Sequence, residues 1–421
     1  MAWAVWAVWA ARARSATEAV RTRSSRLDAL FLTAGIWFLA KFLRYLFPPL
    51  FPTLTTEYAV SNAVVGGAFT ALMLAYAAVQ LPSGVLADRI GGWRVVTVGA
   101  VLAAVAALAV GAPVVLGAPL SFAVLVAAMV FVGVGTGVHK TVSIPLLSRI
   151  YTARTGRALG VLDTAGAFGG VVAPVAVVAV TTGALADVLE WPAIFLATGV
   201  VGLVLAAAFA WRVSGRVPVA DEPTDAFAVG DYARLFADRD VAAFVAVTVC
   251  FSFTYNGAVA FFPTYLVDAG RLAPETAGVL YATLFAVSVV QVLTGSASDS
   301  VGRLPVLAGT LALAGVGLAV VVLAPTAPVL VLGAGTVAFG LGSHGFRPVR
   351  GAFLVDIVPD DAAGGALGAV RTAIMGVGAI APGTVGVLAE AFGFRVAFGA
   401  LLAALVAALA LLVVVAVLVR E

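Results

Sequence analysis

The sequence predicts an all-α membrane protein with twelve transmembrane helices in two pseudo-symmetric six-helix bundles. The first reason is composition, because 62% of the 421 residues are hydrophobic and only 11% are charged, whereas a soluble domain carries about 25% charged residues. The second is that the apolar residues form blocks of roughly 20, the length that crosses a hydrocarbon core about 30 Å thick. The third is that the two halves of the chain repeat one another.

Hydropathy and the polar residues between the apolar blocks place the spans in chain order. We expect them at residues 28–50, 61–84, 95–115, 120–146, 158–180 and 192–211 in the first half, and at 241–266, 274–296, 304–324, 328–352, 366–388 and 395–419 in the second. Residues 27–212 and 241–421 should form the two bundles. We expect residues 1–26 to be a loose cytoplasmic extension and residues 213–240 to be a charged cytoplasmic linker.

The charged residues between the spans predict the orientation in the membrane. Arginine residues gather at residues 89–94, 149–157 and 212–239, whereas the opposite helix ends carry acids such as Asp187 and Glu390. Cytoplasmic loops of membrane proteins carry an excess of Lys and Arg. We therefore expect a multi-pass protein of the plasma membrane with both termini in the cytoplasm.

The two halves repeat one another at the level of single residues. Residues 80–91 (QLPSGVLADRIG) recur as residues 291–302 (QVLTGSASDSVG), displaced by 211 positions. Pro174 recurs as Pro382, displaced by 208 positions. Two parallel repeats imply a pseudo-two-fold axis along the membrane normal, with a substrate site between the halves near the midplane.

The repeated segment contains a motif in the short loop after the second span. Residues 84–94 read GVLADRIGGWR, which resembles the signature G-x-L-A-D-R-x-G-R-[KR] of the major facilitator superfamily. The match departs at Gly92, where the family usually has a basic residue, and the copy at residues 295–303 lacks the first arginine. The resemblance covers the chain from about Leu27. It implies the fold of that superfamily, in which two six-helix bundles rock about a central site by alternating access.

The charged residues of this loop predict a conformational latch. A carboxylate here can accept backbone N–H groups at a helix start or pair with arginines of a neighbouring loop. We expect Asp88 to pair with Arg149, Arg154 or Arg157, and helix capping alone is the alternative. The resemblance implies that the motif residues of both halves form a latch that breaks during the cycle: Gly84, Asp88, Arg89, Gly91, Arg94, Gly295, Asp299, Gly302 and Arg303.

Basic residues within the predicted spans indicate the substrate site. A basic side chain at the bilayer centre costs about 2.5–3.5 kcal/mol on insertion scales, so these residues should face a wet, protein-lined cavity. The repeat relates Lys140 to Arg347 and Asp163 to Arg371, and related positions converge near the pseudo-axis. We expect six residues to bind substrate: Lys41, Arg44, Lys140, Tyr255, Arg347 and Arg371.

Three further residues are candidates for coupling transport to an ion: Asp163, His139 and His344. Each has a structural alternative, because Asp163 can be a counter-ion to Arg371 or Lys140, and both histidines can be packing residues. Arg371, and likewise Arg350, can instead lie near the cytoplasmic helix ends and extend to the interface.

The excess of basic over acidic residues in the spans predicts a secondary active transporter that moves a small anionic solute by symport or antiport. Anion-handling members of the superfamily are similar in carrying an arginine in the first span. The first alternative is a proton-coupled exporter of hydrophobic or cationic compounds. Such exporters usually need acids in the membrane, and residues 166–170 depart from their G-P-x-x-G-G element. The second alternative is a membrane receptor or sensor on the same scaffold.

The motifs of enzymes and of metal, cofactor or nucleic-acid binding are missing from the sequence. It contains no nucleophile–base pair and no nucleotide-binding motif, and its two histidines lie far apart. We therefore expect a non-enzymatic protein without cofactor or metal that works as a monomer. Its expected partners are the lipid bilayer and a small-molecule solute, with or without a co-transported ion.

Overall fold

The computed structural model describes residues 2–151, 155–214, 238–357 and 363–418, of which residues 2–26 and 363–369 are described as backbone only. Twelve helices in this part of the chain are long and apolar enough to cross a membrane, and the described residues contain no strand. The predicted all-α class with twelve spans is therefore confirmed. Most of the predicted linker, at residues 215–237, lies outside the described residues.

The first bundle contains six helices, two of which begin at a serine cap. The side chains of Ser61 and Ser121 accept hydrogen bonds from the backbone N–H groups of Val64 and Val124, as N-cap residues do. The helices are α1 (Ala2–Glu57), α2 (Asn62–Ile90), α3 (Gly92–Leu116), α4 (Phe122–Ile150), α5 (Thr155–Thr181) and α6 (Pro192–Val213).

The second bundle has the same order of spans, and its second span contains a short 3₁₀ segment. The helices are α8 (Arg239–Asp268), α9 (Pro274–Ala286), the 3₁₀ helix η1 (Val287–Val289), α10 (Val290–Val301), α11 (Arg303–Leu323), α12 (Val329–Ile357), α13 (Ala363–Phe392) and α14 (Phe394–Leu418). Helices α9, η1 and α10 together form one span, Pro274–Val301. A 3₁₀ segment inside a helix often marks a functional hinge.

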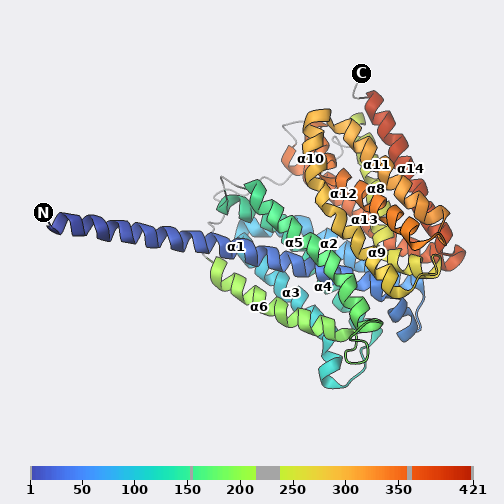
Figure 1. Cartoon of the computed structure of the whole chain (residues 1–421), viewed down its shortest axis with the longest axis horizontal. Coiled ribbons are helices and arrows are strands. Elements are labelled where there is room, and N and C mark those ends of the chain that lie inside the picture. The colour runs from blue at the N-terminus through green and yellow to red at the C-terminus, as the bar shows by residue number, and fades with distance from the viewer. Residues whose placement is uncertain (1, 152–154, 215–237, 358–362, 419–421) are drawn as a thin grey trace.

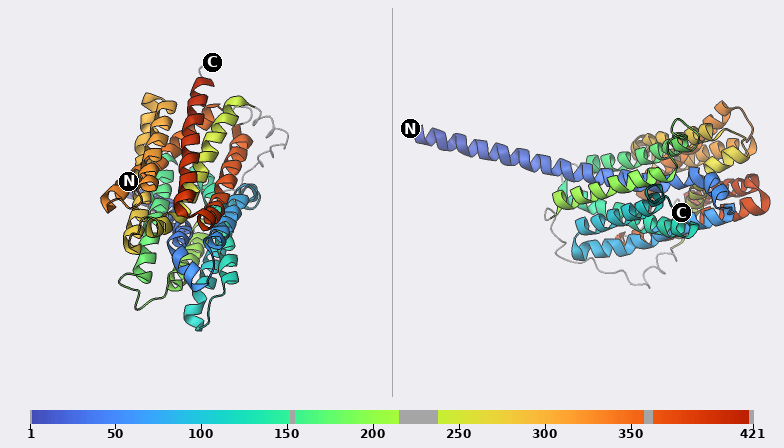
Figure 2. Two further views of the ribbon diagram at one scale, coloured as in Figure 1. Left: turned by 90° about the vertical axis from the view of Figure 1, so that its right-hand side faces the viewer. Right: turned by 90° about the horizontal axis from the view of Figure 1, so that it is seen from below.

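Helix α1 differs from the prediction at both ends. It continues past residue 50, through Pro48, Pro49 and Pro52, to Glu57, because neighbouring helices stabilise a proline-containing membrane helix by packing. It also begins at Ala2, so the extension expected to be loose is helical. Figures 1 and 2 show that this N-terminal part of α1 projects away from the other helices.

The two bundles lie side by side, with the blue-to-green helices in one group and the yellow-to-red helices in the other (Figures 1 and 2). They meet where α2 packs on α13, α5 on α9 and α1 on α8. We call the helix ends at the α2–α3 turn (Gly91) and the α10–α11 turn (Gly302) the loop end. The opposite helix ends are the contact end.

Glycines let the bundles approach closely at the contact end. A Cβ atom on Gly66 of α2 would lie 2.6 Å from the backbone oxygen of Pro382 in α13. A Cβ atom on Gly386 of α13 would lie 2.4 Å from the backbone oxygen of Asn62. Real Cβ atoms do not come this close to another heavy atom, so only glycine permits the observed contact.

Two hydrogen bonds join the bundles in the same region. The backbone N–H of Gly383 donates to Thr70 Oγ1 at 2.8 Å, and the backbone N–H of Ala63 donates to Glu390 Oε2 at 3.3 Å. All four residues lie toward the contact end of α2 and α13. The bundles are therefore closed against one another at this end.

The loop end contains the tight turns that the repeated motif predicts. Gly91 has φ 92° and Gly302 has φ 95°, a backbone conformation that favours glycine. Arg94 donates to the backbone oxygen of Ile90 at 2.8 Å and so caps the end of α2. Arg89 and Asp299 are exposed at this end.

The predicted latch around Asp88 is not formed by the arginines that the structure describes. Among the described residues, no ion pair joins Asp88 to Arg149 or Arg157, and Arg154 lies outside them. Asp88 lies within the last turn of α2, at the motif loop. In this conformation, an ion pair of Asp88 with Arg154 is the one predicted pairing that stays a prediction.

The second bundle instead forms an ion pair that the sequence reasoning missed. Arg303, at the start of α11, pairs with Asp356 at the end of α12. The same guanidinium also donates to the backbone oxygen of Ala352. This interaction ties α11 to α12 within one bundle.

Candidate functional site

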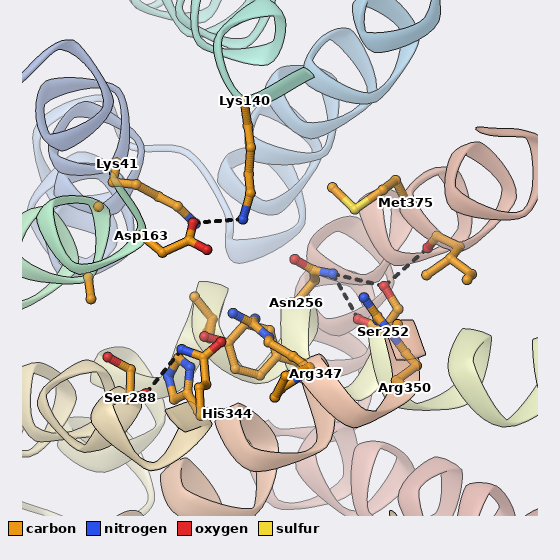
Figure 3. Close-up of a pocket in the computed structure, with 18 of the residues that line it drawn as sticks. Lys41, Lys140, Asp163, Ser252, Asn256, Ser288, His344, Arg347, Arg350 and Met375 are labelled. Carbon is orange, nitrogen blue, oxygen red and sulfur yellow. Dashed lines mark hydrogen bonds and ion pairs between the residues drawn. The ribbon is translucent and has the colours of Figure 1, made fainter. Parts of the chain in front are cut away.

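A central cavity of about 540 Å³ lies between the two bundles. Its wall residues come from the middle of α1, α2 and α8 and from the half of α4, α5, α12 and α13 nearer the loop end. The cavity therefore extends from the middle of the helices toward the loop end, opposite to the end where the bundles are closed. Figure 3 shows this site, with residues of both bundles facing one another across it.

The cavity wall carries a strong excess of positive charge. Among the described residues it contains one acid, Asp163, and six basic side chains: Lys41, Arg44, Lys140, Arg347, Arg350 and Arg371. All six residues predicted to bind substrate, including Tyr255, line this one cavity. The structure thus brings together residues that lie up to 330 positions apart in the sequence (41 and 371).

Arg44 is held by aromatic rings. Its side chain is only 5% exposed, and its Cζ atom lies 4.5 Å from the ring centre of Tyr76 and 5.3 Å from that of Tyr45. Among the described residues, no carboxylate pairs with it. A guanidinium has five N–H donors, so one that lies over a ring still has donors to offer a ligand in the cavity.

Arg347 is held in the same way in the second bundle. Its Cζ atom lies 4.1 Å from the ring centre of Tyr255, which itself is buried. In the part of the chain that the structure describes, Arg347 has no acidic partner either. The two bundles therefore each supply an arginine that is held by tyrosine and is not neutralised.

Lys41 lies one turn before Arg44 on α1. Its Nζ atom donates to the hydroxyl of Tyr45 at 3.4 Å and lies 5.2 Å from the ring centre of Trp37. The aromatic rings around the Lys41 amine offer it a favourable cation–π environment in place of an ionic partner. Lys41 therefore adds a further basic side chain beside Arg44.

Lys140 and Asp163 form the ion pair of the cavity. Lys140 Nζ lies 2.9 Å from Asp163 Oδ1, and the two side chains are 30% and 55% exposed. Both residues belong to the first bundle, on α4 and α5. Asp163 therefore acts as a counter-ion to Lys140, one of the two structural roles predicted for it, and the pair faces the open part of the cavity.

Arg350 and Arg371 line the cavity nearer the loop end. The sequence did not decide whether Arg350 lines the cavity or extends to the membrane interface. The structure places it in the cavity wall. Its Nε atom is buried and, among the described residues, has no hydrogen-bond partner. Arg371 also lines the cavity, and it is exposed there.

The two histidines have different environments. His139 is buried outside the central cavity, where its Nε2 atom lies 3.0 Å from the backbone oxygen of Thr33 and its ring stacks on Trp37. This geometry assigns His139 to packing, which was the structural alternative. His344, in contrast, lies in the cavity wall.

Neutral polar residues that the sequence reasoning missed complete the wall. Asn256 donates to the backbone oxygen of Ser252 at 2.8 Å, and Gln291 donates to that of Ser288 at 3.1 Å. The 3₁₀ segment η1 presents Ser288 to the cavity. Gln291 matches Gln80 in the internal repeat, so the repeat could have indicated that Gln291 lies in the cavity wall. Asn256 is a lone polar residue in an apolar span, and nothing in the sequence indicated its position.

Comparison with known proteins agrees with this architecture. Residues 33–290 and 271–421 match the family model described as Major Facilitator Superfamily. The chain belongs to the Major Facilitator Superfamily. Its twelve long apolar helices agree with the multi-pass membrane fold of that superfamily, and this family and its fold are typically non-enzymatic.

One relative of this superfamily member matches part of the chain. An uncharacterized MFS-type transporter of Mycobacterium tuberculosis is 34% identical over 160 residues, which are 37% of this chain and 26% of that protein. The chain thus matches about a quarter of the length of that relative.

The fold is also similar to solved structures of a bacterial homolog to the human lysosomal transporter Spinster. The inward-facing, unoccupied structure has a TM-score of 0.74 at 16% sequence identity and covers 93% of this chain and 97% of that one. The inward-facing, occupied structure has a TM-score of 0.73 at 16% identity, covering 92% and 96%. At this identity the likeness concerns the fold alone.

Proposed function

We propose that this transporter moves a small organic anion across the membrane by alternating access between its two bundles. The observation that carries the proposal is the charge of the central cavity, where six basic side chains face one acid among the described residues. Unpaired buried cations are costly, so they favour a bound ligand of opposite charge. A secondary transporter with this cavity selects anions.

The manner in which the arginines are held supports the same conclusion. Arg44 and Arg347 lie against tyrosine faces, so their fixed positions do not depend on a carboxylate that would neutralise them. The planar guanidinium fork matches a carboxylate, sulfonate or phosphonate with two parallel hydrogen bonds. One arginine from each bundle would then bind the same anion.

The remaining wall supports an organic rather than a bare inorganic anion. A volume of about 540 Å³ falls within the range of roughly 300–1,000 Å³ that is typical of small-molecule sites. Apolar and aromatic side chains line part of it: Phe69, Met73, Phe251, Phe285, Ile374 and Met375. Such a surface favours a ligand with an apolar body next to its acidic group.

The alternating-access part of the proposal rests on the asymmetry between the two ends. The bundles are joined at the contact end by the Gly383–Thr70 and Ala63–Glu390 hydrogen bonds, while the cavity extends to the loop end. Arginine placement assigns the loop end to the cytoplasm, so this conformation faces inward in a plasma-membrane protein that works as a monomer. Cysteines introduced at Asp187 and Asp299 should accordingly react with impermeant thiol reagents from opposite sides.

An exporter of hydrophobic or cationic compounds is the alternative transporter. It requires acids to bind a cation or to carry a proton, and Asp163 is the acid that the described cavity provides, already paired with Lys140. A receptor on this scaffold would bind an anion without moving it. Uptake into proteoliposomes separates a receptor from a transporter.

The test is a thermal-stability screen with ligands that share one body and differ in charge. Benzoate, benzenesulfonate and phenylphosphonate are compared with neutral benzamide and cationic benzylamine at constant ionic strength. A ligand at 100 times its Kd stabilises a protein by about 2.7 kcal/mol, so binding anions should raise the melting temperature by several degrees. Stabilisation by the amine or the amide alone would favour the exporter.

A variant outside the cavity controls for charge effects on the surface. Arg212, at the end of α6, pairs with Asp28 at 3.2 Å and is 48% exposed. Arg212→Gln should retain the anion-dependent stabilisation, whereas Arg44→Gln should lose it. Loss in both variants would show that the anions act on the overall charge of the protein.

A further inference from the structure

His344 has an unusual position for a buried histidine. Its side chain is only 4% exposed, and it lies in the wall of the central cavity on α12. Its ring lies edge-on to Tyr255, with the centroids 5.9 Å apart, and 6.3 Å from the ring of Phe285. In the described part of the chain, neither Nδ1 nor Nε2 has a hydrogen-bond partner.

The two ring nitrogens of His344 are free to interact with a ligand in the cavity. Buried polar atoms are nearly always hydrogen-bonded, and one left without a partner costs free energy. His139 differs at one nitrogen: its Nε2 atom lies within hydrogen-bond distance of the backbone oxygen of Thr33 and of Ser143 Oγ, while its Nδ1 atom has no partner among the described residues. Beside His344 lie the backbone oxygen of Leu284 and the cavity, and the cavity is where a mobile partner can reach the ring.

The groups around His344 are basic or neutral. Besides the Lys140–Asp163 ion pair, the cavity wall contains these titratable or charged residues: Lys41, Arg44 and Tyr45 from α1, Tyr76 from α2, Tyr255 from α8, Arg347 and Arg350 from α12, and Arg371 from α13. Tyr281 of α9 lies against the ring of Phe285. Among the described residues no carboxylate belongs to this set, since Asp163 is paired with Lys140. In Figure 3, His344 and Arg347 lie together, across the opening from Lys41, Lys140 and Asp163.

The charge of the cavity therefore links a proton on His344 to a bound anion. In the empty cavity a proton would place another positive charge beside Arg347 and opposite Lys41. A bound anion cancels part of that charge, and an imidazolium can donate an N–H to it. Binding energies of two ligands are coupled reciprocally, so the anion favours the proton and the proton favours the anion.

We propose that His344 is the proton-binding site of this transporter, taking up one proton when an anion enters the cavity and releasing it when the anion leaves. The inference rests on the proposed anion transport and adds its coupling ion. The proton comes from water on the side to which the cavity is open, binds the free ring nitrogen and leaves with the anion on the other side. Transport is then a symport of an anion and a proton.

The test counts protons during anion binding. Benzenesulfonate and benzoate are suitable probes, because neither titrates between about pH 6 and 8, where histidine does. Isothermal titration in two buffers of different ionisation enthalpy gives the protons taken up for each anion bound. We expect about one in the wild-type protein above the titration range of His344, with an affinity that falls about tenfold for each unit of pH increase there.

Variants then locate the proton. His344→Gln should bind the probe more weakly, take up no proton and show an affinity that does not depend on pH. His139→Gln, a change of the same residue type outside the cavity, should retain the wild-type proton count. Melting curves without ligand report whether each variant is folded, and the wild-type count and pH dependence test the proposal without any variant.

Separate outcomes overturn the two proposals. Failure of every anion to bind would overturn the proposed function and the symport with it. Anion binding by the wild-type protein without proton uptake would overturn the role of His344 alone. Proton uptake that persists in His344→Gln and disappears in Asp163→Asn would overturn it too, and would assign the proton to Asp163.

Discussion

The two bundles follow one repeated pattern but contribute different charges to the cavity. The first bundle supplies two lysines, Arg44 and the acid Asp163, whereas the second supplies three arginines, His344 and, among the described residues, no acid. At the offset of 208 residues, Asp163 of the first bundle matches Arg371 of the second. The repeat therefore determines where side chains meet, while the charge at matched positions differs between the bundles.

The loop ends of the two bundles differ in the same manner. At the offset of 207 residues that relates Lys140 to Arg347, Arg149 matches Asp356. Asp356 pairs with Arg303, so the second bundle has an acid at the end of its fourth span where the first has a base. The turn glycines are the same in both bundles, and the ion pair is not.

The largest expected effect comes from removing one arginine from each bundle. Arg44→Gln and Arg347→Gln should each weaken binding of the probe anions by about 3 kcal/mol, roughly a hundredfold, because a charge-assisted hydrogen bond is lost in a buried site. Arg44→Lys should also impair binding, since lysine lacks the planar fork. Titration calorimetry and uptake into proteoliposomes measure both.

A difference between the two arginine variants would sharpen the comparison of the bundles. An equal loss in both would indicate that the anion bridges the bundles, and a loss in one alone would assign it to that bundle. Normal transport by both variants, with the surface variant Arg212→Gln as reference, would contradict the anion site.

An intermediate effect is expected at the contact end. Gly386→Ala should place a methyl group against the backbone of Asn62 and destabilise the closed contact by about 1–3 kcal/mol, the usual cost of overpacking. The population should shift toward a conformation in which the contact end is open. Spin labels at Ser61 and Phe392, one in each bundle, measure this distance by electron–electron resonance.

The matched control lies on the same helix. Gly376 of α13 has no heavy atom within 4 Å of the position that a Cβ would take, so Gly376→Ala should leave the distance distribution unchanged. Identical distributions for Gly386→Ala and the wild-type protein would contradict a contact end that closes by glycine packing.

The smallest effect is expected at the loop end. Asp356→Asn removes the ion pair between Asp356 and Arg303. The side chain of Arg303 is 29% exposed and that of Asp356 is 47% exposed. Such a partly exposed pair contributes about 1 kcal/mol or less, so transport rates should change by a few fold. Asp299→Asn should change them less, because Asp299 has no ion pair among the described residues.

Asp88→Asn separates the two explanations of the motif in the first bundle. A latch that forms in another conformation predicts slower transport by folded Asp88→Asn protein, measured in proteoliposomes with matched protein amounts. The start of α3 has no side-chain cap in the described residues, so a solely structural role of Asp88 predicts a changed melting temperature with unchanged transport. The comparison with Asp356→Asn then shows whether the two loop ends act alike.

The sequence predicted most of the cavity because a charge in a membrane span has few places to lie. Lys41 and Arg44 were assigned to the cavity from the cost of exposing them to lipid, and the repeat brought Lys140 together with Arg347. Arg350 was left between two positions, because a residue near a helix end can reach either the interface or the cavity. The orientation of α12 decides which of these two positions the side chain of Arg350 takes.

The histidines illustrate what hydropathy and spacing do not contain. On the sequence, His139 and His344 were equivalent candidates for coupling. In the structure one contacts a backbone carbonyl between packed helices, and the other has two unpaired nitrogens in the cavity wall. The difference depends on which neighbouring helix supplies a partner, and that is set by tertiary packing.

The sequence by itself thus determined the membrane class, the twelve spans, the internal repeat and the set of charges that a cavity must accommodate, because each follows from hydropathy and from the cost of burying charge. The tertiary structure decided which charges pair, which rings hold the arginines and which end of the bundles is closed. These three features depend on contacts between helices that are distant in the chain. The sequence around a residue does not determine which side chain of another helix it will contact.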